Sequence, residues 1–162
     1  MKIQGKHVQL SESVILGGLS VIVGLTSGAG VWLFKWLIDQ IDWLMFDQLG
    51  IAMQPLGSWR VIVYPLLGGL LVGLLRQIFI KEERHHGVAG IMEAVALAGG
   101  RLRYKRIPIK TIAAAISIGS GASVGPEDPS VQLGSNLGSM FGQALHLSDE
   151  RMRALVAAGA AS

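Results

Sequence analysis

The sequence predicts an all-α membrane protein in which the chain crosses the bilayer more than once. Hydrophobic residues make up 51% of the 162 residues and charged residues only 15%, with a mean hydropathy of +0.49. The first half contains uncharged segments close to the roughly 20 residues that a helix needs to span about 30 Å of hydrocarbon. The lipid bilayer is therefore the expected solvent for most of the chain.

The first predicted crossing is the uncharged segment from Ser13 to Phe34. Ser11 followed by Glu12 suits a helix N-cap with an acidic first turn, so the helix is expected to begin near residue 11. The aromatic and acidic residues after the crossing are typical of a helix end at the membrane interface. We expect this helix to run to about Gln48.

A second uncharged segment, Val61 to Leu75, can extend to Ile80 and follows a turn signal at residues 55–58. Basic residues occur near the N-terminus and densely from Arg101 to Lys110, whereas the connection between the two crossings has only Arg60. The positive-inside rule therefore predicts that the N-terminus and the loops after the second crossing are cytoplasmic.

The rest of the chain contains shorter elements. Val88 to Leu97 is too short to span a bilayer. Pro108 and Pro129 suit the first turns of two further helices, because proline lacks the N–H that is unpaired there. A last helix is expected from Asp149 and shows no C-cap signal, so residues 1–162 are expected to form one partial membrane domain that is truncated within a helix.

Small residues at four-residue spacing predict two faces on which helices approach each other closely. Glycine has no side chain, so two helix backbones can come into contact at such a face. One face lies in the first crossing and the other in the helix after Pro129; they consist of Ser20, Gly24 and Gly28, and of Gly134, Gly138 and Gly142.

Two glycine-containing stretches lead into short helices, at His86-Gly87-Val88 and at Gly125-Pro126-Glu127-Asp128-Pro129. The unpaired N–H groups and the positive end of the dipole make each helix start attractive to an anion. Two broken helices directed at one point can hold an anion in the middle of a membrane, as many transporters do. We therefore predict an anion site in which Glu127 competes for the same N–H groups as a gate and can also carry a proton.

A simpler role is also open for these carboxylates. An acidic residue in a first turn stabilises its own helix by about 0.3–1 kcal/mol, which would be enough to explain Asp128, and Glu127 if it stood alone. His85 and His86 together with the two carboxylates could bind a divalent cation, although only the side-chain types support such a site.

Several other functions lack a motif. The glycines before Glu127 are not followed by the Gly-Lys-Ser/Thr of a phosphate loop, and no serine has His and Asp partners at a recognisable spacing. Basic residues do not interleave with aromatic ones on one face, and the chain has no cysteine. We therefore expect neither an enzyme nor a nucleic-acid-binding protein, and we expect no cofactor or metal.

The run GSGASVGPEDPSVQLGSNLGS, from Gly119, resembles the Gly-Lys/Arg-Glu-Gly-Pro segment of the CLC family of chloride channels and chloride/proton antiporters. Gly125, Glu127 and Pro129 are in register with that motif. Upstream, HHGVAGIMEAVALAGGRLR, from His85, resembles the segment that contains the family's Gly-Ser-Gly-Ile-Pro motif. The same offset joins both motifs, and the likeness extends over nearly the whole chain, which would cover the N-terminal half or less of a CLC subunit.

The resemblance implies an inverted-repeat fold with broken helices, in a subunit that pairs with a second copy in the plasma (inner) membrane. Glu127 would be the gating and proton-transfer glutamate. His86 would take the place of the serine that helps to coordinate the central anion. The other anion-binding positions implied in this way are Gly87, Val88, Gly125 and Asp128.

The chain departs from the family motifs at three positions. Pro126 stands where the gating motif has a basic residue, Asp128 where it has a glycine, and Ala89 where the upstream motif has a proline. A second carboxylate, at Asp128, is expected to weaken anion binding unless it points away or is protonated.

The predicted function is transport of chloride or a similar small anion, as a channel or as an anion/proton antiporter. One alternative is a non-transporting membrane module, or a truncated inactive fragment, whose glycine faces only pack against partner helices. Another is a proton or divalent-cation pathway that uses Glu127 and Asp128.

Overall fold

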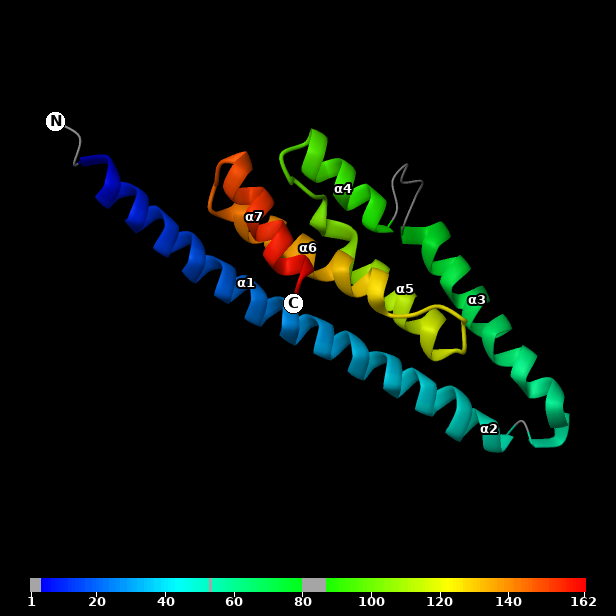
Figure 1. Ribbon diagram of the computed structural model, residues 1–162. Coiled ribbons are helices and arrows are strands. Elements are labelled where there is room, and N and C mark those ends of the chain that lie inside the picture. The colour runs from blue at the N-terminus through cyan, green and yellow to red at the C-terminus, as the bar shows by residue number, and fades with distance from the viewer. Residues whose placement is uncertain (1–3, 53, 80–86) are drawn as a thin grey trace.

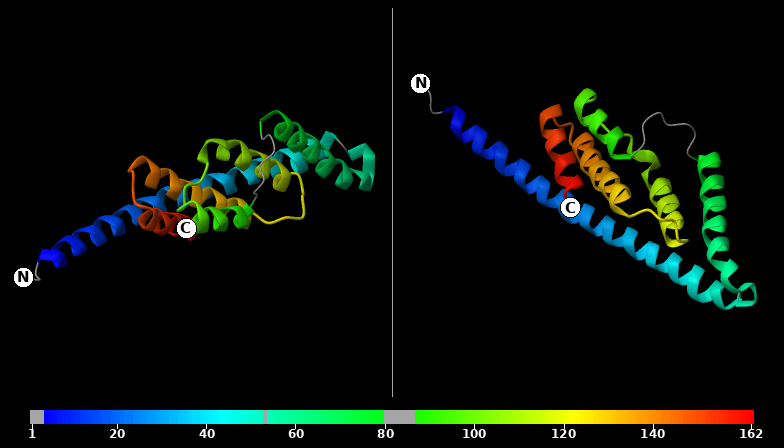
Figure 2. Two further views of the ribbon diagram at one scale, coloured as in Figure 1. Left: turned by 90° about the horizontal axis from the view of Figure 1, so that it is seen from above. Right: turned by 45° about the vertical axis from the view of Figure 1, so that its right-hand side comes forward.

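The computed structural model describes residues 4–52, 54–79 and 87–162, and within these ranges it contains helices and no strand. The long helices α1 (Gln4–Asp42) and α3 (Arg60–Phe79) form the two arms of a V (Figure 1). Figure 2 shows that shorter helices lie between the arms; they are α4 (Gly87–Leu97), α5 (Ile107–Gly119), α6 (Glu127–Ala144) and α7 (Asp149–Ala160). The predicted all-α class is confirmed for the described residues.

The first helix begins earlier than the sequence indicates. It already includes Gln4, so the predicted start near residue 11 is wrong. Residues 4–10 contain no proline, and a helix can therefore propagate through Ser11 with one hydrogen bond per residue. Beyond Asp42 the helix continues through a π-helical segment, η1 (Trp43–Gln48), into the short α2 (Leu49–Ala52).

The two predicted crossings both form helices. Within the described residues, the segments Val14–Ile51 and Gly57–Phe79 are long and apolar enough to cross a membrane. Only 11% of the residues in each apolar window are buried in the protein, which is unlike the core helix of a water-soluble fold. Large apolar side chains such as Leu25 and Leu66 are 71% and 66% exposed. Exposed apolar surface of this kind suits contact with lipid.

α1 packs on α5, α6 and α7 with a face that lies beside the predicted small-residue face. The packed face is formed by Val23, Ser27, Gly30 and Phe34. By contrast, no atom outside the helix's own backbone lies within 4 Å of a Cβ added at Gly24 or Gly28. The buried face carries Val23 and Phe34, which bury more apolar area than the glycines of the predicted face would. The predicted face of the first crossing thus has no partner within the described residues.

The second small-residue face, on α6, packs as predicted, and its partner is α7. Gly138 directly contacts the backbone carbonyl oxygen of Leu155, and Gly134 contacts that of Gly159. A Cβ at either glycine would overlap the carbonyl oxygen. The two helices therefore touch backbone to backbone, and no larger residue fits at these positions without moving α7.

The packing of α1 on α6 predicts that a pair of introduced cysteines can form a disulfide. A Cβ at position 30 would contact the Leu133 side chain, at 3.3 Å from Cδ2 and 3.7 Å from Cγ, and two cysteines need such close side-chain contact to form a disulfide. Because the chain has no cysteine, the pair Gly30→Cys and Leu133→Cys should close under mild oxidation and become protected from a maleimide-polyethylene glycol gel shift. The control pair Gly24→Cys and Leu133→Cys should remain reactive; equal protection of both pairs would contradict the packing.

The turn after α4 is fastened to α6 by two polar side chains. Gly100 has a φ of 83°, a left-handed conformation that favours glycine. The hydroxyl of Ser139 donates to the Gly100 carbonyl at 2.7 Å and accepts from the N–H of Leu102 at 2.8 Å. Gln143 Nε2 donates to the Leu102 carbonyl at 2.9 Å. These bonds fix the start of the basic segment, which runs from Arg101 to Lys110.

Candidate functional site

The two glycine-containing helix starts predicted to act together do meet in space. The N–H of Val88, in the first turn of α4, donates a hydrogen bond of 2.9 Å to Oδ1 of Asp128, in the first turn of α6. The two residues are 40 positions apart in the chain. The packing of α4 on α6 therefore joins the two motifs through one carboxylate.

Gly87 makes this close approach possible. Its φ is 73°, in the left-handed region that side chains rarely adopt. A Cβ at this position would lie 3.2 Å from Oδ1 of Asp128, tighter than ordinary van der Waals contact. Both the backbone conformation and the available space thus favour glycine at the start of α4.

The other oxygen of Asp128 is also held. Gln132 Nε2, one turn along α6, donates to Oδ2 at 2.7 Å. The carboxylate is therefore oriented by one bond from α4 and one from its own helix. Gln132 was not among the predicted site residues, although an Asp and a Gln four residues apart on a helix are a recognisable hydrogen-bonding pair.

Glu127 is placed differently. It is the first residue of α6 and is exposed, and its carboxylate folds back onto Gly125, where a Cβ would overlap Oε2. Asp128, rather than Glu127, is thus the carboxylate that bonds to α4. The Asp128 carboxylate points towards α4 rather than away from it.

The remaining predicted positions are only partly covered. His86 lies outside the described residues. Gly87, Val88, Gly125, Glu127 and Asp128 all lie at the starts of α4 and α6. Within residues 4–52, 54–79 and 87–162, no three His, Cys, Asp or Glu side chains gather as a metal site would require.

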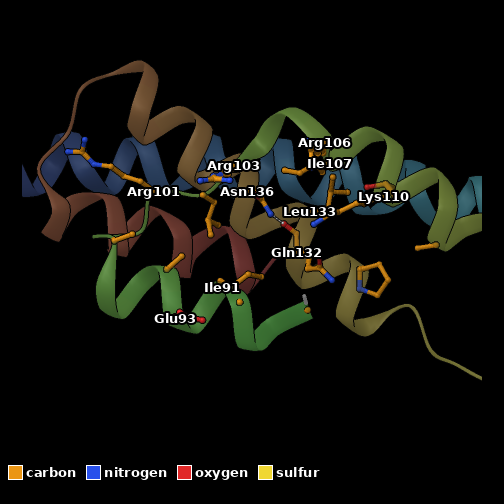
Figure 3. Close-up of a pocket in the computed structure, with 18 of the residues that line it drawn as sticks. Ile91, Glu93, Arg101, Arg103, Arg106, Ile107, Lys110, Gln132, Leu133 and Asn136 are labelled. Carbon is orange, nitrogen blue, oxygen red and sulfur yellow. Dashed lines mark hydrogen bonds between the residues drawn. The ribbon is translucent and has the colours of Figure 1, made fainter. Parts of the chain in front are cut away.

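A cavity of about 740 Å³ lies beside these helix starts, between α4, the beginning of α5 and α6. Figure 3 shows Glu93 on α4 at one side and Arg106 and Lys110 at the other, with Gln132 of α6 between them. Among the described residues, the lining has one acidic side chain, that of Glu93, and four basic ones: Arg101, Arg103, Arg106 and Lys110. An excess of positive charge around a cavity raises the local concentration of anions.

The cavity reaches the helix starts, because Gly87, Pro129 and Gln132 also line it. At its outer end Arg101 forms an exposed ion pair of 3.2 Å with Asp149 of α7. In the sequence, the basic segment from Arg101 to Lys110 indicated only which side of the membrane it faces. Its position in a cavity depends on the packing of residues 87–114 against residues 129–136 of α6.

Comparison with known families covers the same region. The sequence model described as "Voltage gated chloride channel" matches residues 68–162, which is more than half of the chain and includes both motifs. The chain belongs to this family. The resemblance to CLC proteins is thereby confirmed, and CLC family members are channels or transporters rather than enzymes.

Curated relatives support the same assignment. A ClcB-like protein of Ralstonia nicotianae is 34% identical over 148 residues, covering 87% of this chain and 34% of the relative. The voltage-gated ClC-type chloride channel ClcB of Yersinia pestis is 30% identical over 150 residues, covering 89% and 36%. Chloride channel protein CLC-e of Arabidopsis thaliana is 31% identical over 149 residues, covering 87% and 20%.

The chain spans about a third of the length of the two bacterial relatives. No solved structure matches it. Family membership and the two long apolar helices together indicate a membrane protein.

Proposed function

We propose that the protein transports chloride or a similar small anion across a membrane, as part of a CLC-type channel or anion/proton antiporter. The observation that carries the proposal is the meeting of the two helix starts, where the N–H of Val88 binds the carboxylate of Asp128 at 2.9 Å. An N–H at a helix start that holds a carboxylate oxygen also suits a mobile anion, because both have a negative charge and accept hydrogen bonds.

The two helix starts favour passage of an anion over its tight binding. Backbone N–H groups and helix dipoles carry only partial charges, so an anion bound by them can leave again. The basic cavity supplies full charges nearby, which attract anions towards Gly87 and Gln132 without contributing the innermost contact. In this proposal His86, Gly87, Val88, Gly125, Glu127 and Asp128 are the anion-binding positions.

Glu127 is proposed as the gate and proton carrier. Its exposed side chain stands at the first position of α6, so rotation about its side-chain bonds can move the carboxylate while the helix stays in place. When ionised it competes with an anion for the N–H groups at the helix start, and when protonated it does not. Such a group links anion passage to proton concentration.

We further propose that the N-terminus and the basic segment from Arg101 to Lys110 face the cytoplasm, in the plasma (inner) membrane. The cavity would then open towards the cytoplasm and receive anions from that side. Family resemblance supports a homodimer, in which each subunit has its own anion path. The protein's whole activity would also use parts of the relatives that this chain does not span.

The direct test is chloride efflux from liposomes that contain the purified product of the intact gene, with the external pH recorded in the same trace. We expect chloride to leave the liposomes when valinomycin, by carrying K⁺, dissipates the membrane potential that opposes chloride efflux. Accompanying proton movement would identify an antiporter, and its absence a channel. Correctly folded protein that releases no chloride, bromide or nitrate would contradict the proposal and favour a non-transporting membrane module.

A further inference from the structure

We propose that Asp128 is a tethered anion that occupies the start of α4 and that a transported anion must displace. The inference rests on the proposed function and concerns the regulation of the same site. In the related gating motif this position is a glycine, so the competing carboxylate is a property of this chain.

The Asp128 carboxylate occupies the start of α4 through two hydrogen bonds. Oδ1 of Asp128 accepts the N–H of Val88 at 2.9 Å, and Oδ2 accepts Nε2 of Gln132 at 2.7 Å. Hydrogen bonds to a charged acceptor are about twice as strong as those between neutral groups. The carboxylate therefore satisfies the group at the start of α4 that an incoming anion would use.

The basic cavity leads an incoming anion to the Asp128 carboxylate. Gly87, which precedes the Val88 N–H bound by Asp128, and Gln132, which donates to the same carboxylate, also line the basic cavity. An anion in the cavity is therefore drawn towards a place that already holds a negative charge. Two negative charges a few ångströms apart repel each other, so binding requires Asp128 to rotate away from Val88.

The Asp128 carboxylate lies at a different helix start from the carboxylate of Glu127, the proposed gate. The carboxylate of Glu127 lies against Gly125 and that of Asp128 against α4, although the two residues are neighbours in the chain. The two carboxylates thus compete at different helix starts, Glu127 at α6 and Asp128 at α4. Glu127 controls passage, whereas Asp128 sets the anion concentration at which the site fills.

The test is chloride binding to the purified product of the intact gene, by isothermal titration calorimetry, with Asp128→Ala. A competitor that fills a site nine-tenths of the time lowers its apparent affinity about tenfold, so the variant should bind chloride about tenfold more tightly. Chloride should also raise the melting temperature of the variant more than that of the wild type, because the ion replaces the missing carboxylate. Gluconate at equal ionic strength measures any general salt effect.

Two further variants make the result specific. Asp128→Asn keeps the size and one acceptor oxygen but removes the charge, and it should tighten chloride binding to a smaller extent; it also serves where the alanine variant does not fold. Glu150→Gln removes a comparable exposed charge from the first turn of α7 and should leave the affinity unchanged.

The sign of the change decides between the two roles of Asp128. Unchanged or weaker chloride binding in both Asp128 variants, with wild-type transport intact, would overturn the inference and leave Asp128 as a cap of α4. A wild type that transports no anion would contradict the proposed function. Absence of chloride binding even after removal of the carboxylate would overturn both proposals.

Discussion

Gly138→Ala is expected to lower the free energy of unfolding by about 1–3 kcal/mol, because overpacking a close contact forces the surrounding backbone to shift. The added methyl group would overlap the carbonyl oxygen of Leu155, which belongs to the backbone of α7 and cannot turn aside as a side chain can. A loss of this size should lower the melting temperature by roughly 2–10 °C, measured by circular dichroism in detergent.

Gly24→Ala is the matched control. Both glycines lie inside helices, where alanine is favoured over glycine by about 1 kcal/mol. At Gly24 an added Cβ meets nothing within 4 Å, so this variant should be as stable as the wild type or slightly more stable. The difference between the two variants measures the contact alone. Equal stability of the two variants would show that α6 and α7 do not cross at Gly138.

Glu127→Gln is expected to remove most of the pH dependence of anion flux. The amide has the shape of a protonated carboxyl group and no charge, so it mimics the open gate at every pH. One controlling proton can change flux by up to about tenfold per pH unit, and the variant should lose this response. In an antiporter, the same change should also stop the accompanying proton movement.

The measurement is chloride efflux from liposomes at several external pH values, for the wild type, Glu127→Gln and Glu150→Gln. Glu150 is also an exposed acidic residue in a helix first turn, but it lies on α7, away from the two helix starts that meet. Its variant should keep the wild-type pH profile. A Glu127 variant with that same profile would rule out Glu127 as the gate.

Local patterns predicted the elements of the candidate site well. Pro108 and Pro129 lie in the first turns of α5 and α6, and the short segment from Val88 to Leu97 forms α4. Local patterns failed at Ser11, where a cap signal lies inside a longer helix. A capping residue only favours a helix start, and it does not stop a helix whose preceding residues can also be helical.

The roles of the two adjacent carboxylates were beyond sequence reasoning. Glu127 and Asp128 both suit the first turn of a helix, and nothing in the order of residues tells which one reaches α4. That depends on how α6 is rotated against α4, because neighbouring residues on a helix point about 100° apart. The same rotation brings Gln132 onto Asp128 and places the basic segment around a cavity.

By itself, the sequence determined the all-α class, the two long apolar helices, the short helices and the glycine face of α6, because each depends on residues close together in the chain. Only the tertiary structure decided which face of α1 is buried, which helix covers Gly138, and which carboxylate binds Val88. These outcomes depend on competition between surfaces for burial and between charges for one N–H group. Such a competition is decided by contacts between distant segments, which local patterns do not contain.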